Sequence, residues 1–212
     1  MFKHVFYMKN QETIWNSLYS KGLFWKKSTL ELKNIIIKKS VLELGVGNGK
    51  TLKSILNQNP KQVVALDISG EAIKISEESI KSNKVIYIKS DIFKLDIREK
   101  FDVVFCYYFL NNFKKRRGIE VINKIKSLLK SNGTILFEDF ATGDFRENKY
   151  LKKIEENTIQ KKNGLICHFF EKKEIFNLFK DFRDIKIEEK TFSPIRTDKA
   201  IRRRILKAVI RN

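Results

Sequence analysis

Cysteine and proline are both scarce in this sequence, which has two of each among its 212 residues. Cys106 and Cys167 have no partners at metal-ligand spacing, so the sequence argues against a disulfide framework, a zinc site or any other metal site. We expect both thiols to be reduced and buried. Pro60 and Pro194 form no proline-rich linker and nothing repeats, so we expect a single domain over residues 1–212.

Long apolar runs are also missing. None approaches the ~18 residues that a membrane-spanning helix requires. The N-terminal stretch MFKHVFYMKN lacks the apolar segment of a secretion signal. The composition, 42% hydrophobic and 12% aromatic, is that of a globular protein. The sequence therefore predicts a cytoplasmic protein that crosses no membrane.

Acidic residues are fewer than basic ones: the sequence has 25 Asp and Glu residues and 44 Lys and Arg residues, which gives a net charge of +19. Such charge could neutralise phosphates or attract an acidic partner. Most of it is lysine, in a chain also rich in Ile, Asn and Phe, and AT-rich coding produces this mixture without selection for nucleic acid. A solvated lysine-rich surface is the simpler interpretation, and RNA binding stays open.

Short β-like runs alternate with helix-length segments along the chain. The predicted strands are 40–44, 62–66, 84–88, 101–108, 133–140, 184–192 and 203–211, although the last could also form a basic helix. Apolar residues recur at intervals of three and four residues in four segments, which predicts helices over 49–58, 69–82, 116–130 and 171–182. This alternation predicts an α/β fold with a doubly wound, mostly parallel sheet between helices.

Two segments stand outside this alternation. Residues 10–38 predict two helices before the first strand, and residues 141–170 form an insertion before the helix at 171. Segments of this kind commonly form a lid or a substrate wall. We therefore expect a helical lid over 1–38, a cofactor-binding core over 39–140, a substrate-side insertion over 141–170, and a C-terminal helix and strands over 171–212.

The stretch VLELGVGNGK places Gly45, Gly47 and Gly49 directly after a buried strand. Glycine permits positive φ and a close approach of backbone to ligand. The first strand-to-helix turn of an open parallel sheet is the usual ligand cradle, and the helix start offers free N–H groups. Gly45 and Gly47 would let the chain turn sharply against the ligand, while Gly49 would let the helix pack on the strand.

Asp67 ends the second strand, 22 residues after Gly45. A carboxylate at this distance commonly holds the two hydroxyls of a ribose, although Asp67 could instead be a helix N-cap. The loop is G-x-G-x-G rather than the dinucleotide pattern, and Glu43 precedes it. A carboxylate there would repel a pyrophosphate but suits an ammonium. S-adenosylmethionine carries both an ammonium and a ribose.

Five motifs in order and at ordinary spacing make the sequence resemble the Rossmann-fold (class I) S-adenosylmethionine-dependent methyltransferases over about residues 39–140. They are E-L-G-V-G-N-G at 43–49, L-D-I-S at 66–69, K-S-D-I-F at 89–93, F-D-V-V-F at 101–105 and S-L-L-K-S-N-G-T-I-L at 127–136. The resemblance implies S-adenosylmethionine as cofactor. It also implies a seven-stranded sheet whose last strand, 203–211, is antiparallel between two others.

The resemblance implies a role for each motif residue. The cofactor-binding residues would be Glu43, Gly45, Val46, Gly47, Gly49, Asp67, Ile68, Asp91, Ile92 and Tyr107. Glu43 would lie near the amino group, and Asp67 would hold the ribose. The Asp91 carboxylate would accept from the adenine amine while the Ile92 N–H faces a ring nitrogen. Taken alone, Asp91 could equally be a turn or cap residue.

Methyl transfer is an in-line displacement that depends mainly on alignment, and a base is needed only when the acceptor must lose a proton first. The segment 106–112 lacks the D/N-P-P-Y/F signature of amino-group methylation on adenine or glutamine. Tyr107 and Tyr108 could line the methyl site or belong to the core. His168 could act as acid, base or orienting group, or it could support its loop.

Aromatic residues of the leading segment, Trp15, Tyr19 and Trp25, could close over the cofactor or pack between helix and sheet. A small-molecule methyl acceptor is the leading prediction, in a monomer or homodimer. RNA methylation is the alternative, supported by Arg116-Arg117 and a basic tail. The tail residues are Arg196, Lys199, Arg202, Arg203, Arg204, Lys207 and Arg211. A non-catalytic S-adenosylmethionine-binding partner protein is a third reading.

Overall fold

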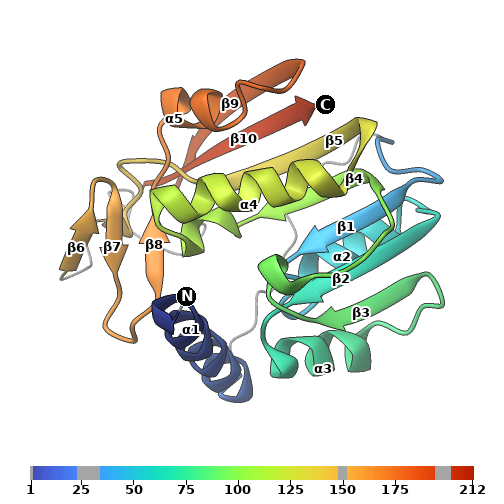
Figure 1. Ribbon diagram of the computed structural model, residues 1–212, viewed down its shortest axis with the longest axis horizontal. Helices are drawn as coiled ribbons and strands as arrows, with labels where there is room; N and C mark the ends of the chain where they lie inside the picture. The colour runs from blue at the N-terminus through green and yellow to red at the C-terminus, as the bar shows by residue number, and fades with distance from the viewer. Residues whose placement is uncertain (1, 23–33, 148–151, 194–201) are drawn as a thin grey trace. The chain divides into compact units, whose positions relative to one another are not determined.

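The computed structural model describes residues 2–22, 34–147, 152–193 and 202–212 (Figure 1). The chain divides into two compact units. Unit 1 comprises Met1–Phe105 and Leu128–Lys130, and unit 2 comprises Cys106–Ser127 and Ser131–Asn212. The prediction that 1–212 form one domain stays a prediction.

A seven-stranded sheet has the order β3-β2-β1-β4-β5-β10-β9. Its strands are β1 (Ser40–Leu44), β2 (Gln62–Asp67), β3 (Val85–Lys89), β4 (Phe101–Tyr107), β5 (Leu129–Phe140), β9 (Asp184–Phe192) and β10 (Arg203–Arg211). β1 and β2 are parallel, as are β2 and β3, while β10 is antiparallel to both β5 and β9. This confirms the predicted α/β sheet and its antiparallel last strand.

Unit 1 places three helices around its strands: α1 (Phe2–Ser20), α2 (Lys50–Leu56) and α3 (Gly70–Ser79). Ser69 caps α3, because its Oγ accepts from the Ala72 N–H at 3.1 Å. The first helix begins earlier than the predicted segment 10–38. Most of the predicted second helix lies outside the described residues, and residues 34–38 form a bend and turns. Asn34 and Lys38 take the left-handed conformation, which stops a helix.

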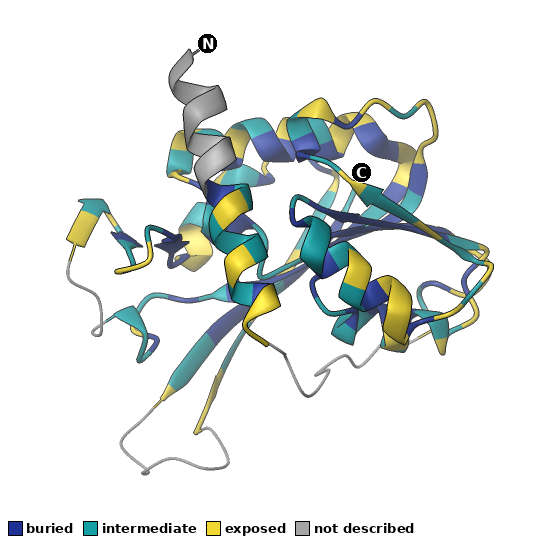
Figure 2. Cartoon of the chain, turned by 90° about the horizontal axis from the view of Figure 1, so that it is seen from below, coloured by how far each residue is buried: buried dark blue, intermediate teal, exposed yellow. Residues whose placement is uncertain are grey.

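The central strands of unit 1 are buried on both faces. All five residues of β1 are buried, as are five of the six in β2. Figure 2 shows this burial as dark blue strands, while the helices alternate between blue and yellow. The near-continuous apolar runs of these strands predicted this arrangement, because a strand covered on both faces has no polar side.

Unit 2 contains η2 (Leu110–Asn112), α4 (Lys115–Leu128) and α5 (Lys172–Leu178) besides its strands. The predicted insertion forms a three-stranded antiparallel sheet of β6 (Lys152–Glu155), β7 (Thr158–Gln160) and β8 (Ile166–His168). Ile159, Cys167 and Phe169 form its core against Phe140. Cys106 and Cys167 are free and buried, as expected.

β5 begins at Leu129, four residues before the predicted start. The run Ser131-Asn132-Gly133 predicts a turn, yet it is extended here within the strand. The register with β10 covers Thr134–Phe140, and just before it the Gly133 carbonyl accepts from the Asn212 N–H at 2.9 Å. No helix within the described ranges combines the length and apolar character that a membrane span needs.

Candidate functional site

The loop between β1 and α2 is built on left-handed glycines. Gly45, Gly47 and Gly49 have φ values of 72°, 56° and 74°. The N–H groups of Gly45 and Val46 both donate to the Leu66 carbonyl, at 2.8 and 3.0 Å, which fixes the loop to the end of β2. A side chain would strain the backbone at these positions.

Two of these glycines also lack room for a side chain. A Cβ on Gly47 would lie 2.6 Å from the Tyr19 hydroxyl, and a Cβ on Gly49 would lie 2.5 Å from Ile80 Cδ1. Gly49 is also the N-cap of α2. The close neighbours of Gly49 belong to α3 and its C-cap, so Gly49 lets α3 approach the loop, while Gly47 lets α1 approach it. Close packing of α2 on β1 at Gly49 stays a prediction.

Asp67 links the loop to the end of β2. Its Oδ2 accepts from the Gly47 N–H and its Oδ1 from the Ser69 N–H, both at 2.9 Å, and the residue is 8% exposed. The N-cap of α3 is Ser69, so the N-cap reading of Asp67 is wrong. Each carboxylate oxygen keeps a further lone pair for a ligand hydroxyl.

Glu43 is a second buried carboxylate of unit 1. It is 3% exposed, and its Oε2 has no hydrogen-bond partner within the described part of the chain. Burial, followed by the negative charge of Asp67, raises the pKa of Glu43 well above its ordinary value, against the opposing effect of Lys50. Burial likewise raises the pKa of Asp67 to about 6. The backbone N–H groups of Gly47 and Ser69 offset only part of the effect of burial on Asp67, and Glu43 Oε2 has no such donor among the described residues.

Asp91 and Ile92 follow β3. Asp91 caps the short helix η1 (Ile92–Lys94), with its Oδ1 accepting from the Phe93 N–H at 3.1 Å. Its Oδ2 is buried and has no partner among the described residues. The cap role is therefore confirmed for one oxygen, and the other is free for a ligand N–H. Ile92 and Val46 are buried, and Ile68 is half-buried.

α1 packs onto the loop region within unit 1. Asn16 Oδ1 accepts from Ser69 Oγ at 2.7 Å, and Glu12 forms a 2.7 Å ion pair with Lys89. Tyr19 is 6% exposed, with its ring centroid 6.0 Å from that of Trp15. Two of the predicted lid aromatics thus lie on a helix fixed beside the loop, and Trp25 lies outside the described residues. The anchoring by Asn16 was not anticipated from the sequence.

In unit 2, Tyr107 is the last residue of β4 and Tyr108 follows it. Burial, then the charge of Glu138, raises the pKa of both phenols. Tyr108 has a φ of 51°, unusual outside glycine, and its hydroxyl donates to Glu138. Such phenols are hydrogen-bond donors and not bases. Whether either faces an acceptor stays a prediction.

Sequence reasoning missed the carboxylates that end β5. Glu138 is 1% exposed and pairs with Lys207 at 2.9 Å, while Asp139 is fully buried and accepts from the Asn111 N–H at 3.0 Å. Burial raises the pKa of Asp139 well above its ordinary range. The signal was present, since two acidic residues close an apolar run in ILFEDF, as Asp67 closes β2.

His168 lies in β8 and is 1% exposed. Its Nδ1 is 2.6 Å from Thr158 Oγ1, its Nε2 is 2.8 Å from Glu174 Oε1, and its ring meets Phe170 edge-on at 4.5 Å. Both ring nitrogens are engaged, so the geometry favours the supporting role over acid-base chemistry.

A family model described as a methyltransferase domain matches residues 37–183, well over half of the sequence. The chain belongs to the methyltransferase domain family. Its fold is the Rossmann-like fold of S-adenosylmethionine-dependent methyltransferases, and the sequence motifs predict S-adenosylmethionine as its cofactor.

The relatives of this methyltransferase differ in their acceptors. The tRNA N(3)-methylcytidine methyltransferase trm141 of Schizosaccharomyces pombe is 24% identical over 149 residues, covering 64% of this chain and 60% of that protein. The malonyl-[acyl-carrier protein] O-methyltransferase of Priestia megaterium is 28% identical over 109 residues, covering 51% and 39%. The chain thus spans 39% to 60% of the length of these two relatives.

A solved structure from Anabaena variabilis, described as an S-adenosylmethionine-dependent methyltransferase, aligns with a TM-score of 0.73. The identity is 17%, and the alignment covers 97% of this chain and 94% of that one. At this identity the similarity shows the fold.

The carboxylates of unit 1 fit this cofactor. Glu43 Oε2 and Asp91 Oδ2 are buried and unpartnered within the described ranges, and Asp67 keeps free lone pairs. Buried oxygens of this kind call for a ligand that supplies its own N–H and O–H donors. S-adenosylmethionine supplies an ammonium, two ribose hydroxyls and the adenine amine.

The raised pKa of Asp67 predicts that cofactor affinity falls in mild acid. Ribose hydroxyls held by Asp67, as the motifs predict, would donate to the carboxylate form, so affinity should weaken below pH about 6, by up to about tenfold per pH unit. Stability moves the other way. The folded pKa lies above the unfolded one, so the contribution of Asp67 to stability increases as pH falls through about 6 toward about 4.

Calorimetric titration with S-adenosylmethionine from about pH 7.5 to about pH 5 measures this effect. Asp67→Asn, which cannot titrate, is the control and should flatten the profile. Any slope that remains in the variant belongs to another group such as Glu43. A wild-type profile as flat as that of the variant would contradict the prediction.

Because both ring nitrogens of His168 contact polar partners, we expect its replacement to lower the stability of the protein. His168→Asn should lower the free energy of unfolding by about 1–3 kcal/mol, because it leaves buried partners unsatisfied. Affinity for S-adenosylmethionine should be unchanged. Denaturant unfolding and calorimetry test both, with the exposed Lys173→Ala as control. Full stability combined with lost turnover would favour the acid-base role instead.

Proposed function

We propose that this protein transfers a methyl group from S-adenosylmethionine to a small-molecule acceptor by in-line displacement. The observation that carries the proposal is the set of buried, donor-poor carboxylates beside a loop of left-handed glycines. Each of these features costs stability in the free protein. A ligand that presents donors to the carboxylates offsets that cost.

The cofactor would be held by residues of unit 1. The carboxylate of Glu43 would attract the ammonium, and Gly45, Val46 and Gly47 would line the methionyl part. Asp67 with Ile68 would hold the ribose. Asp91 Oδ2 and the Ile92 N–H would recognise adenine.

The transfer itself requires alignment more than proton removal. The cofactor supplies a methyl group activated by positive sulfur, and the protein has to orient the acceptor in line with it. Tyr107 and Tyr108 are proposed to line the acceptor, with phenols that stay protonated at neutral pH because their pKa values are raised. An acceptor whose lone pair is already free needs no base.

The charge of the C-terminal strand supports a small acceptor over RNA. Arg204 pairs with Glu189, Lys207 with Glu138 and Arg211 with Asp184. These basic side chains of β10 are therefore neutralised within unit 2. Charge that is already paired contributes little to the counterion release that drives RNA binding.

RNA methylation is the second candidate. The similarity to a tRNA methyltransferase and the net charge of +19 favour it, and the Arg116 side chain is 95% exposed. RNA binding would have to weaken steeply with salt, since each phosphate contact releases counterions. A flat salt response between about 50 and 200 mM would remove this candidate.

Cofactor labelled in its methyl group separates these functions. The protein is incubated with it and with cell extract split into RNA and small-molecule fractions. Label in the small-molecule fraction supports the proposal, and label in RNA replaces it with the second candidate. Cofactor binding without any transfer would favour a non-catalytic partner protein. Failure to bind S-adenosylmethionine would overturn both enzymatic readings.

A further inference from the structure

Arg203 of β10 holds a positive charge that no acidic side chain among the described residues neutralises. Its guanidinium carbon lies 5.5 Å from the ring centre of Tyr108, 5.9 Å from that of Phe140 and 5.5 Å from that of Phe192. Its Nη2 donates to the Tyr108 hydroxyl at 3.2 Å. Across the described part of the chain, no carboxylate lies within ion-pair distance of it. Its Nε–H is buried and without a hydrogen-bond partner there.

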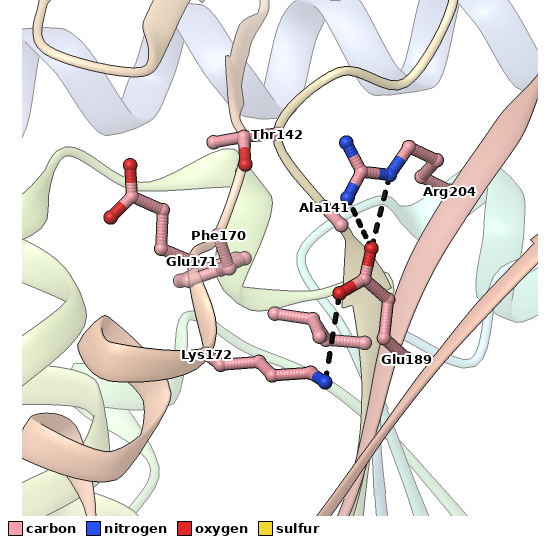
Figure 3. Close-up of a pocket in the computed structure, with 8 residues that line it drawn as sticks. Ala141, Thr142, Phe170, Glu171, Lys172, Glu189 and Arg204 are labelled. Carbon is pink, nitrogen blue, oxygen red and sulfur yellow. Dashed lines mark hydrogen bonds and ion pairs between the residues drawn. The ribbon is translucent and has the colours of Figure 1, made fainter.

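The neighbouring basic residues are different. Arg204 donates to Glu189 through Nε at 3.0 Å, and Lys172 lies 3.8 Å from the same carboxylate. Figure 3 shows Arg204 and Lys172 reaching Glu189 at a pocket of about 230 Å³. Alternate residues of a strand point to opposite faces, so Arg203 lies on the other face of β10. Arg203 thus differs from its neighbour in lacking an acidic partner.

Tyr108 is held so that it can orient this arginine. Its backbone takes a left-handed conformation, and its N–H donates to the Glu138 carbonyl at 2.7 Å. The Tyr108 hydroxyl donates a hydrogen bond to the Glu138 carboxylate and accepts one from Arg203. The Glu138 charge is itself paired with Lys207 at 2.9 Å. The hydrogen bond to a neutral phenol therefore positions the Arg203 charge without cancelling it.

We propose that Arg203, positioned by Tyr108 and framed by Phe140 and Phe192, binds a carboxylate group of the small-molecule methyl acceptor. This inference rests on the proposed function and names the acceptor class, an acidic small molecule with a planar body. Arg203 is half-buried, so a ligand can reach it. Phe192 is 37% exposed and pairs directly opposite Arg203, so an apolar surface borders the charge.

The chemistry of the site favours a carboxylate over a polyanion. A guanidinium is planar and matches a carboxylate with two parallel hydrogen bonds. The aromatic rings suit a flat organic body next to that group. A phosphate backbone would instead call for several unpaired cations in a row, and on β10 Arg204, Lys207 and Arg211 are already paired.

Nitrogen-proton NMR of the arginine Nε–H groups tests the site directly. Benzoate is the probe, with benzamide as its neutral counterpart and inorganic phosphate as a competing anion. Arg203→Lys assigns the Arg203 signal by its disappearance. We expect benzoate to shift that signal saturably, benzamide and phosphate to shift it less, and the Arg204 signal to stay in place. Equal shifts with benzamide, a stronger response to phosphate, or none to benzoate would overturn the carboxylate site.

Transfer of labelled methyl groups to the acidic small-molecule fraction of extract gives the functional test. Arg203→Gln should reduce this transfer by about 10- to 100-fold, the loss that removal of a charge-assisted pair produces, and Arg203→Lys should reduce it less. Arg211→Gln removes the same charge from the far end of β10 and should leave transfer unchanged.

The outcomes separate the two proposals. The carboxylate acceptor would be overturned if label appeared only in neutral or cationic products or in RNA. It would also be overturned if Arg203→Gln transferred methyl groups at the wild-type rate. Cofactor binding is expected to be intact in every variant. A benzoate response in a protein that transfers no label would keep the anion site and remove the proposed methyl transfer.

Discussion

Asp67→Ala is expected to lower the affinity for S-adenosylmethionine by about 100-fold or more. The proposed carboxylate accepts two ribose hydroxyls, and each charge-assisted hydrogen bond contributes about 1.5–3 kcal/mol. The variant also removes the acceptors of the Gly47 and Ser69 N–H groups, which shape the loop. Calorimetric titration measures the loss.

The matched control for this prediction is Glu78→Ala. Glu78 is an exposed carboxylate on α3, in the same unit as Asp67, and its removal should leave the affinity within about twofold. Circular dichroism would show that both variants are folded. An affinity of Asp67→Ala close to that of the wild type would show that Asp67 does not hold the cofactor.

Gly49→Ala is expected to destabilise the protein by about 2–5 kcal/mol. The left-handed backbone costs an alanine about 1–2 kcal/mol, and the contacts of the new Cβ add about 1–3 kcal/mol. Those contacts are 2.5 Å to Ile80 Cδ1 and 2.7 Å to Ser76 Oγ. Such a loss is a large part of the ~5–15 kcal/mol that stabilises a typical domain. Denaturant unfolding gives the change.

Gly118→Ala is the matched substitution on α4. A Cβ there would meet nothing within 4 Å, and alanine is the better helix former by about 1 kcal/mol. We expect Gly118→Ala to be neutral or stabilising. If the two alanine variants lost equal stability, the special role assigned to the Gly49 conformation would be wrong.

The sequence predicted the glycine loop after the first strand because its signals are local, while the cofactor roles of its residues stay predictions. The glycines of 45–49 follow a buried run within a few residues, and Asp67 closes the next strand. The structure confirms the glycine conformations and the burial of Asp67. The sheet was predictable for the same reason, since each strand is a short run with a distinct apolar pattern.

The contacts of Tyr108, which is proposed to line the acceptor, were harder to predict because the residues involved meet across long distances in the chain. Tyr108, Glu138 and Arg203 come together from three strands or strand ends. The sequence pattern singled out Tyr108, but the acidic pair that closes the run ILFEDF went unused, and Arg203 was counted only as one more basic residue. The contacts of His168 with Thr158 and Glu174 likewise required the structure.

The sequence by itself determined the α/β sheet, the glycine loop and the carboxylates at strand ends, because backbone conformation and strand burial depend on residue type and short-range pattern. Tertiary structure alone decided which charges are neutralised. Arg203 and Arg204 are adjacent and chemically identical, yet one is bound by a carboxylate and the other lies among aromatic rings. β9 pairs with both residues, so the difference arises from the two faces of β10 and from the side chains that the folded sheet brings to each face.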